Sequence, residues 1–498
     1  MSSYDDYDIP GSRFSVDFSG HDSPLVAMGR IRRGDLGGGM RTINNSAYHI
    51  MRWGEALNFA TDASLDRYHT PHFSLAVEAL AAAYGSQADE VLVHYAPALL
   101  RSSLSWLEGI DHLKNVPANQ GGAFKRVRIF PERNGRRLRG FRNYSDAIIN
   151  IDEFYRGVRD EGVLEDIETL ERSAQGLTGE ARIRRMEYTM RCILAACETK
   201  KDFQPSTQSS DFLTLENLRT IDLAPVMLQA LIAHKFALTA KALRLRRQDG
   251  DEPMAEYLEG WVQELKELIG TMWVDKSDTE GYLSDLDKNG NPTGAYDLTC
   301  CYPLFVPGMV PYDRQVKMAS TFVNHLARPY GYLISPATTG QQWDGDPDKV
   351  DARGNIIEFG DNRGWPGDIM LAGEAFLTAA IEAQKAGRDP EPLIQAAEVA
   401  LRVVPGIAIS LEELKHFKEK LNVVRPAKFV NGGEYGRTED EEQKGFGLTI
   451  AAQRSLAGRD FRHEVANPQD SWRDFAFARV SSGLLVASNE RFGRRRRR

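Results

Sequence analysis

Cysteine is scarce in this chain, and the placement of the few cysteines excludes the common scaffolds built on them. Four occur among 498 residues, at Cys192, Cys197, Cys300 and Cys301. Neither pair forms a CxxC motif, and no histidine accompanies them at the spacing of zinc ligands. So few cysteines in so long a chain do not make a disulfide framework. We therefore expect reduced cysteines, with no metal and no cofactor.

Signals for export and for membrane insertion are also missing. The N-terminus, MSSYDDYDIPGSRF, is acidic and polar, whereas a signal peptide is basic and then apolar. No apolar run reaches the length of a transmembrane helix. The net charge of -8 and the lack of nucleic-acid-binding motifs argue against a nucleic-acid partner. We expect a cytoplasmic protein with no membrane and no nucleic-acid partner, and the sequence leaves its oligomeric state open.

Several standard catalytic and metal-binding motifs are absent as well. The chain has no GxxxxGK[ST] phosphate loop, no HExxH and no GxSxG. One segment, DLDKNGNPTGAYD, matches the opening of a calcium loop at Asp285, Asp287 and Asn289. Its twelfth position is Tyr296 instead of a bidentate glutamate, and Asn289-Gly290 is typical of a tight hairpin. The sequence therefore favours a plain hairpin over a metal loop.

Helical periodicity is the most abundant pattern in the chain. One segment repeats apolar residues at helical spacing on a single face, namely Met254, Leu258, Trp261, Leu265, Leu268 and Met272. The segment 222–250 begins with aspartate and proline and ends with basic residues and a glycine, which are helix start and stop signals. The same period recurs along the chain and predicts about a dozen helices.

The number of helices and the loops between them predict the architecture. No linker rich in Pro, Gly and Ser divides the chain, and so many helices do not fit around one bundle core. A solenoid should show a fixed repeat period, which is absent. We expect an all-α fold, an α/α toroid of paired antiparallel helices, as a single domain over residues 1–488. Residues 489–498 are a basic tail, expected to be solvated and disordered, with adhesion to anionic surfaces as the alternative.

The loop TTGQQWDGD, residues 338–346, has the composition of a sugar-binding surface. Trp343 offers a flat apolar ring, and Asp344 and two glutamines offer hydrogen-bonding groups beside it. A sugar presents a C–H face to an aromatic ring and a rim of hydroxyls to amides and carboxylates. Other loops carry carboxylates and arginines. Glycoside hydrolysis needs such groups, since one carboxyl protonates the leaving oxygen and a second activates water or attacks.

Several motifs occur in an order and spacing that match a known family. PGSRFSVDFSGHDS contains Arg13 and Asp22, and LDRYHTPHF contains Arg67 and His69, with Asn58 nine residues before Arg67. ETKKDFQPST, GQQWD, RGWPGD, FKEKLNV and NGGEYGRTEDEEQKGFGLT follow. Together these motifs resemble the signatures of the trehalases, which are inverting glycoside hydrolases with a six-hairpin α/α toroid. The resemblance runs over nearly the whole chain.

The resemblance implies a role for each matching residue. Asp202 corresponds to the general acid, and Glu419, fifteen residues before Glu434, corresponds to the general base. The implied substrate-binding residues are Arg13, Asp22, Asn58, Arg67, His69, Trp343, Asp344, Trp365 and Glu434.

The implied function is hydrolysis, with inversion, of an α-glucosidic bond in trehalose or a related small α-glucoside. Lys200 and Lys201 replace a Gly-Trp pair of the family beside Asp202, and they suit an anionic sugar. The alternative is a catalytically lapsed toroid that binds carbohydrate or is structural.

Overall fold

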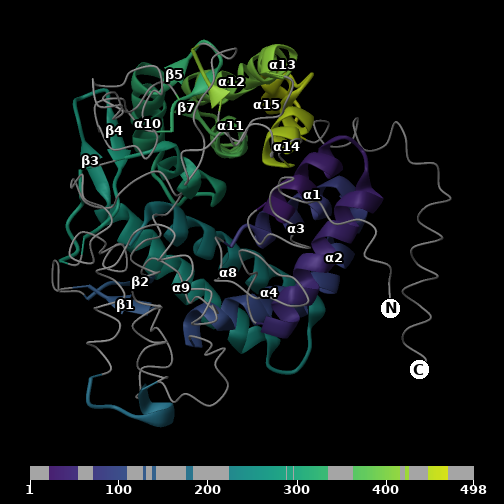
Figure 1. Ribbon diagram of the computed structural model, residues 1–498, viewed down its shortest axis with the longest axis vertical. Helices are drawn as coiled ribbons and strands as arrows, with labels where there is room; N and C mark the ends of the chain where they lie inside the picture. The colour runs from purple at the N-terminus through teal and green to yellow at the C-terminus, as the bar shows by residue number, and fades with distance from the viewer. Residues whose placement is uncertain are drawn as a thin grey trace.

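The computed structural model describes residues 22–53, 71–108, 127–130, 137–141, 175–182, 224–287, 289–294, 296–334, 363–414, 421–424 and 447–468. Helices dominate these residues (Figure 1). The predicted basic tail, 489–498, lies outside them.

The described helices come mostly in sequential pairs joined by short turns. They are α1 (Asp22–Arg32), α2 (Leu36–Trp53), α3 (Phe73–Tyr84), η1 (Gly85–Gln87), α4 (Ala88–Glu108), α8 (Val226–Arg246), α9 (Asp251–Thr271), the 3-10 helix η4 (Leu298–Phe305), α10 (Tyr312–His325), α11 (Pro366–Lys385), α12 (Glu391–Leu401), α13 (Val403–Leu414), α14 (Gly447–Leu456) and α15 (Phe461–Ala466).

The described strands are short and form two-stranded antiparallel ladders. These pair β1 (Val127–Ile129) with β2 (Arg139–Phe141), β3 (Trp273–Asp275) with β4 (Gly281–Leu283), β5 (Ala327–Arg328) with β6 (Gly331–Tyr332), and β7 (Arg363–Gly364) with β8 (Leu421–Asn422).

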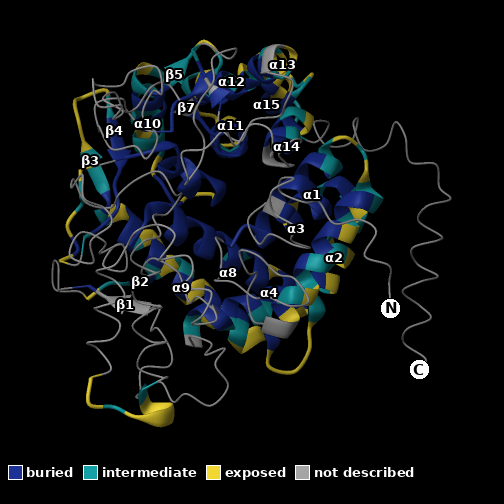
Figure 2. Ribbon diagram, viewed as in Figure 1, coloured by how far each residue is buried: buried dark blue, intermediate teal, exposed yellow. Residues whose placement is uncertain are grey.

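Burial separates the helices into an inner and an outer set. Side chains of α8 and α11 are buried on almost every side, whereas α9 buries the single face that its periodicity predicts, including Leu258, Trp261 and Leu265. Figure 2 shows the inner helices in dark blue and exposed residues on the outer ones. The predicted basic residues lie in the last turn of α8, but the predicted glycine stop is wrong. The left-handed Arg247 ends α8, and Gly250 is the N-cap residue of α9 instead.

The expectation that no apolar run reaches transmembrane length is wrong, because two helical stretches among the described residues, 226–246 and 391–412, are long and apolar enough to cross a membrane. In the first, 89% of the apolar window is buried inside the protein. That helix, α8, is buried on almost every side by its neighbours, so its apolar window belongs to the core.

The inner helices close into a ring. Neighbouring elements in contact are α1 with α3, α3 with α8, α8 with η4, η4 with α11, α11 with α14, and α14 with α1. Figure 1 shows the purple α1 beside the yellow α14. Their backbones approach closely at Gly29, where a Cβ atom would lie 2.9 Å from Cα of Ala451. The predicted all-α toroid of paired helices is confirmed.

A buried ionic cluster lies where the ring closes. Nη2 of Arg32, at the end of α1, is 2.8 Å from Oε2 of Glu374 in α11. Arg459 bonds to Glu374 and, at 2.7 Å, to Oε2 of Glu464 in α15. Burial opposes charge on Glu374, but the two arginines hold the pKa of its carboxyl below the usual value. Burial also lowers the pKa of Arg32 to about 10. Helices from both ends of the described chain are joined here.

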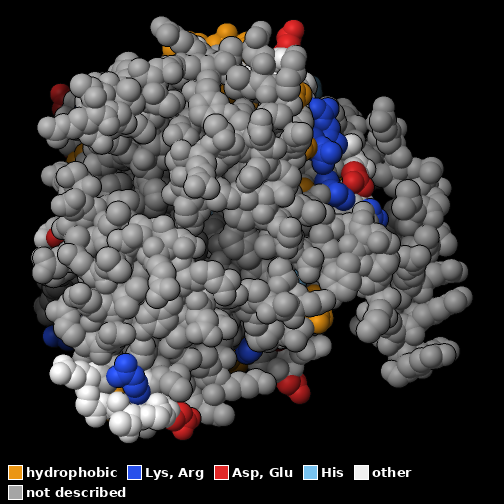
Figure 3. All heavy atoms as spheres, viewed as in Figure 1, with side chains coloured by type: hydrophobic (Ala, Val, Ile, Leu, Met, Phe, Trp, Pro, Cys, Tyr) orange, Lys and Arg blue, Asp and Glu red, His pale blue; other side chains and the backbone are white. Residues whose placement is uncertain are grey.

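Charged groups at the turn between α1 and α2 lie at the surface. On the face shown in Figure 3, blue basic side chains gather with an acidic one along the edge formed by α1 and α2. At this edge Arg30 lies 3.9 Å from Asp35, whose side chain is more than half exposed. Such pairs contribute little to stability.

The segment 285–292 forms the predicted hairpin. Leu286 and Pro292 make an antiparallel bridge, and the amide of Gly290 donates to the carbonyl of Asp287. Oδ1 of Asp287 accepts from the amides of Asn289 and Asn291, each at 2.8 Å. The carboxylate that suggested a calcium loop therefore caps the turn.

Candidate active site

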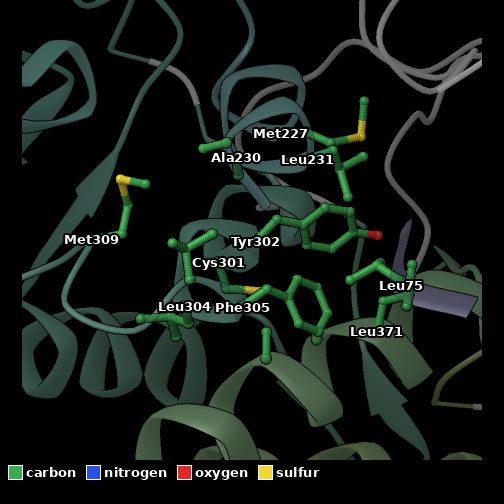
Figure 4. Close-up of a cluster of buried hydrophobic side chains, with 14 of the residues drawn as sticks. Leu75, Met227, Ala230, Leu231, Cys301, Tyr302, Leu304, Phe305, Met309 and Leu371 are labelled. Atoms are coloured by element: carbon green, nitrogen blue, oxygen red, sulfur yellow. The ribbon is translucent and has the colours of Figure 1, made fainter. Parts of the chain in front are cut away.

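The first turns of several inner helices meet around η4. Figure 4 shows Tyr302 and Phe305 of η4 packed among side chains of three other elements. Leu75 comes from the first turn of α3, Met227 from the first turn of α8, and Leu371 from the start of α11. The N-termini of these inner helices therefore gather at one place in the ring.

A polar cluster lies within these apolar contacts. The Tyr302 hydroxyl donates a 2.8 Å hydrogen bond to Oδ1 of Asp368, in the first turn of α11. His72, the residue that precedes α3, presents its ring to Tyr302 in an edge contact. All three side chains are buried. Burial raises the pKa of Tyr302 well above its ordinary value, and the Asp368 carboxylate raises it further. The hydroxyl therefore stays protonated and remains the donor.

A second buried aspartate, Asp297, fixes the start of η4. Its Oδ1 accepts hydrogen bonds from the amide and the hydroxyl of Thr299, at 2.8 and 2.6 Å. The backbone amide of Leu298, the residue between Asp297 and Thr299, donates to the carbonyl of Ile334 at 2.8 Å. The Ile334 side chain packs on Trp365, whose own side chain is 6% exposed. Trp365 occupies the N-cap position of α11, so these contacts join the starts of η4 and α11.

One strand pair brings two predicted site segments together. In the ladder of β7 and β8, Gly364 pairs with Leu421. Gly364 stands directly before Trp365, and Leu421 comes two residues after Glu419. The chain that follows the predicted general base therefore runs beside the chain that enters α11.

Two of the sequence-predicted site residues are described. Trp365 lies at the N-terminus of α11, and Asp22 is the first residue of α1, with its backbone alone described. The remaining predicted residues lie outside the described residues: Arg13, Asn58, Arg67, His69, Asp202, Trp343, Asp344, Glu419 and Glu434. Each belongs to a segment that leads into α1, α3, α8, α11 or α14. Their roles remain predictions.

The sequence analysis missed His72, Tyr302, Asp368 and Asp297. Asp368 gave no separate signal, because an aspartate in the first turn of a helix is common and suits the helix N-terminus. No local pattern pairs it with Tyr302, 66 residues earlier in the chain.

A surface groove of about 630 Å³ lies elsewhere, between α10, the start of α12 and the β3–β4 turn. Two of its polar side chains are engaged with neighbours, since Lys317 bonds to Asp275 at 3.0 Å and Asn324 to Glu280 at 2.8 Å. It contains none of the predicted site residues. Among the described residues, no group of three or more His, Cys, Asp or Glu is placed to hold a metal ion.

Known proteins resemble this chain over most of its length. The periplasmic trehalase of Xanthomonas axonopodis pv. citri (strain 306) is 26% identical over 340 residues, which are 68% of this chain and 53% of that protein. The periplasmic trehalase of Escherichia coli O8 (strain IAI1) is also 26% identical over 340 residues, 68% of this chain and 54% of that protein. The chain spans about half the length of the curated relatives it matches.

The solved structures that match this chain in a structural comparison are distant from it in sequence. The GH63 mannosylglycerate hydrolase from Thermus thermophilus, in complex with Tris and D-glycerate, is 12% identical with a TM-score of 0.49. The match covers 90% of this chain and 95% of that chain. A bacterial glucoamylase complexed with acarbose is 10% identical with a TM-score of 0.41, covering 93% of this chain and 51% of that one.

The expected cytoplasmic location is contradicted by these relatives. Both trehalases are named as periplasmic proteins. The expectation relied on few cysteines and an acidic N-terminus. A protein that needs no disulfide folds in an oxidising compartment as well as in a reducing one, so a low cysteine content does not indicate the compartment.

The family assignment comes from a match that covers more than half of the chain. The family model described as Trehalase matches residues 2–347. This range includes the segments with the motifs around Arg13, Arg67, Asp202 and Trp343. The resemblance inferred from those motifs is confirmed, and the chain belongs to the trehalase family.

Proposed function

We propose that this chain is a glycoside hydrolase that cleaves an α-glucosidic bond in trehalose or a related small α-glucoside, with inversion. The observation that carries the proposal is the family match over residues 2–347, a range that contains Asp202. Glu419 lies beyond this range, and its assignment rests on the resemblance of its motif to the family signature. Asp202 stands where the family has its general acid, and Glu419 keeps the separation of fifteen residues from Glu434.

In the proposed reaction the two carboxyl groups have opposite tasks. Asp202 protonates the glycosidic oxygen as the bond breaks, and Glu419 removes a proton from the water that attacks the other face of the sugar. An inverting pair of this kind stands roughly 6.5–9.5 Å apart, which leaves room for the water. The pairing of β7 with β8 supports this assignment, because it brings the chain after Glu419 alongside the approach to Trp365.

The remaining predicted residues suit the recognition of a small sugar. Trp343 and Trp365 offer aromatic surfaces to the C–H face of a ring. Carboxylates and amides accept from or donate to hydroxyls, and arginines donate. The residues proposed for hydrogen bonding are Arg13, Asp22, Asn58, Arg67, His69, Asp344 and Glu434. The proposed partner is therefore a small carbohydrate.

Lys200 and Lys201 favour one variation of this proposal. Two ammonium groups next to Asp202 stabilise its ionised form, which opposes the task of a general acid. A phosphate or carboxylate on the sugar would neutralise them. An anionic α-glucoside is thus a candidate substrate, and a lapsed toroid that only binds carbohydrate is the second candidate function.

The test measures turnover and binding with the same set of sugars: trehalose, other small α-glucosides, and a phosphorylated one. We expect the wild-type protein to release glucose from at least one of them. Asp202→Asn should abolish release and still bind that sugar in a calorimetric titration. Binding without turnover by the wild-type protein would favour the lapsed toroid, and neither binding nor turnover would contradict both functions.

A further inference from the structure

Three contacts, together with the continuity of the chain at the start of α11, link η4 and α11 into a closed circuit around Trp365. The Tyr302 hydroxyl bonds to Asp368 at 2.8 Å. The amide of Leu298, in the same 3-10 helix, bonds to the carbonyl of Ile334. The Ile334 side chain packs on Trp365, and Trp365 and Asp368 share the first turn of α11. A displacement of any member therefore strains the other contacts of the circuit.

The buried Asp368 side chain in this circuit destabilises the fold unless its hydrogen-bonding partners are in place. Asp368 is 2% exposed and Tyr302 is fully buried. A buried carboxylate is destabilising without hydrogen bonds or a favourable dipole. The Tyr302 hydroxyl supplies a hydrogen bond, and the start of α11 supplies the positive end of a helix. Removing the Tyr302 hydroxyl deletes this hydrogen bond and leaves the Asp368 carboxylate in place.

We propose that Tyr302 and Asp368 are positioning residues, which fix the first turn of α11 and thereby the indole of Trp365 at the sugar site. His72 adds the start of α3 to the same arrangement through its edge contact with Tyr302. That these contacts fix the position of the indole is inferred from the circuit and does not depend on the proposed function. That the indole binds a sugar rests on the proposed function.

A matched control exists in the outer helices. Tyr95 in α4 is 3% exposed, and its hydroxyl donates to Oδ1 of Asn44 in α2, also at 2.8 Å. Tyr95→Phe and Tyr302→Phe each remove one hydroxyl from a buried tyrosine and leave one side-chain oxygen behind. The two variants differ in whether the lost bond belongs to the circuit.

Hydrogen exchange tests the positioning without reference to any sugar. The amide of Ile369 bonds to the carbonyl of Trp365 at 2.9 Å, and the β7–β8 ladder lies directly before it. We expect Tyr302→Phe to speed exchange at Ile369 and in this ladder about 10-fold or more, as for the loss of a hydrogen bond to a charged group. Tyr95→Phe should leave these amides unchanged. Equal exchange in both variants, or none above wild type, overturns the proposal.

Steady-state kinetics test the consequence for the sugar site. Because the circuit positions a binding surface, Tyr302→Phe should raise KM about tenfold and change kcat less than about twofold. Tyr95→Phe should leave both constants unchanged. A wild-type protein without turnover contradicts the proposed function, and the exchange measurement still decides the positioning role. Normal KM in a variant with rapid exchange contradicts the link between the circuit and the sugar.

Discussion

Two buried polar clusters in this ring contrast in how they compensate their charge. Where the ring closes, Glu374 lies between two arginines, and Arg459 has a second carboxylate in Glu464. Beside η4, Asp368 is held by the neutral hydroxyl of Tyr302. The first cluster neutralises its own charges and joins helices distant in sequence. The second lies among the starts of inner helices, beside a predicted binding residue. The first cluster therefore joins the ring, and the proposal made above assigns the second to the positioning of Trp365.

The largest expected effect on catalysis without an effect on stability is at Glu419, the predicted general base. Glu419→Gln keeps the shape of the side chain and removes the group that accepts the proton from water. We expect kcat to fall by about 10²- to 10⁴-fold, the usual contribution of a general base. The midpoint of urea unfolding should stay that of the wild-type protein. A variant with unchanged kcat would remove Glu419 from the mechanism.

The opposite result is expected at the ring closure. Glu374→Gln leaves Arg32 and Arg459 buried without the charge between them. Breaking a buried pair in this way costs about 3–5 kcal/mol in the free energy of unfolding. Urea unfolding measures that loss, and kcat of the protein that remains folded should be close to that of the wild type. A loss below about 1 kcal/mol, typical of exposed pairs, would show that the cluster does not hold the ring.

A smaller effect is expected at Glu280, where β4 meets α10. A hydrogen bond from Asn324, with His325 and Lys276 nearby, lowers the pKa of Glu280 from 4.5 to about 2. A lowered pKa in the folded state adds stability above pH 4.5, and this is lost as the pH falls toward 2.

Stability measured against pH tests this expectation. Glu280→Gln should be less stable than the wild type at neutral pH, and the difference should shrink as the pH falls from 4.5 to 2. A difference that stays constant over this interval would show that the pKa of Glu280 is not lowered.

The smallest effect is expected for an exposed pair on the outer face. Glu391, at the start of α12, bonds to Arg462 at 2.6 Å, and both side chains are at least 40% exposed. Solvent screens such pairs, so Glu391→Gln should leave the midpoint of urea unfolding unchanged within error. A clear loss of stability would contradict the expectation that exposed ion pairs contribute much less to stability than buried ones.

The sequence predicted those parts of the fold that local patterns encode. Periodicity and end signals located α8 and α9, and the Asn289-Gly290 turn was identified from its residue types. The helix η4 was missed because its sequence, LTCCYPLF, is an apolar run with proline inside and no helical period. Its cap, Asp297, and its neighbours hold it in place.

The candidate site was predictable from sequence only where residues match family motifs. Trp365 was predicted in this way, and it lies at an inner-helix N-terminus, while its role in sugar binding stays a prediction. Tyr302 and Asp368 were missed because their contact joins two elements far apart in the chain. Such a contact depends on the packing of the ring, which no short motif records.

The central claim, inversion at an α-glucosidic bond, is tested most directly by proton NMR of the first anomers released from trehalose. With inversion, the attacked ring appears as β-glucose and the leaving ring keeps its α configuration. The account therefore predicts equal amounts of α- and β-glucose before mutarotation. Early release of α-glucose alone would show retention and contradict the roles proposed for Asp202 and Glu419.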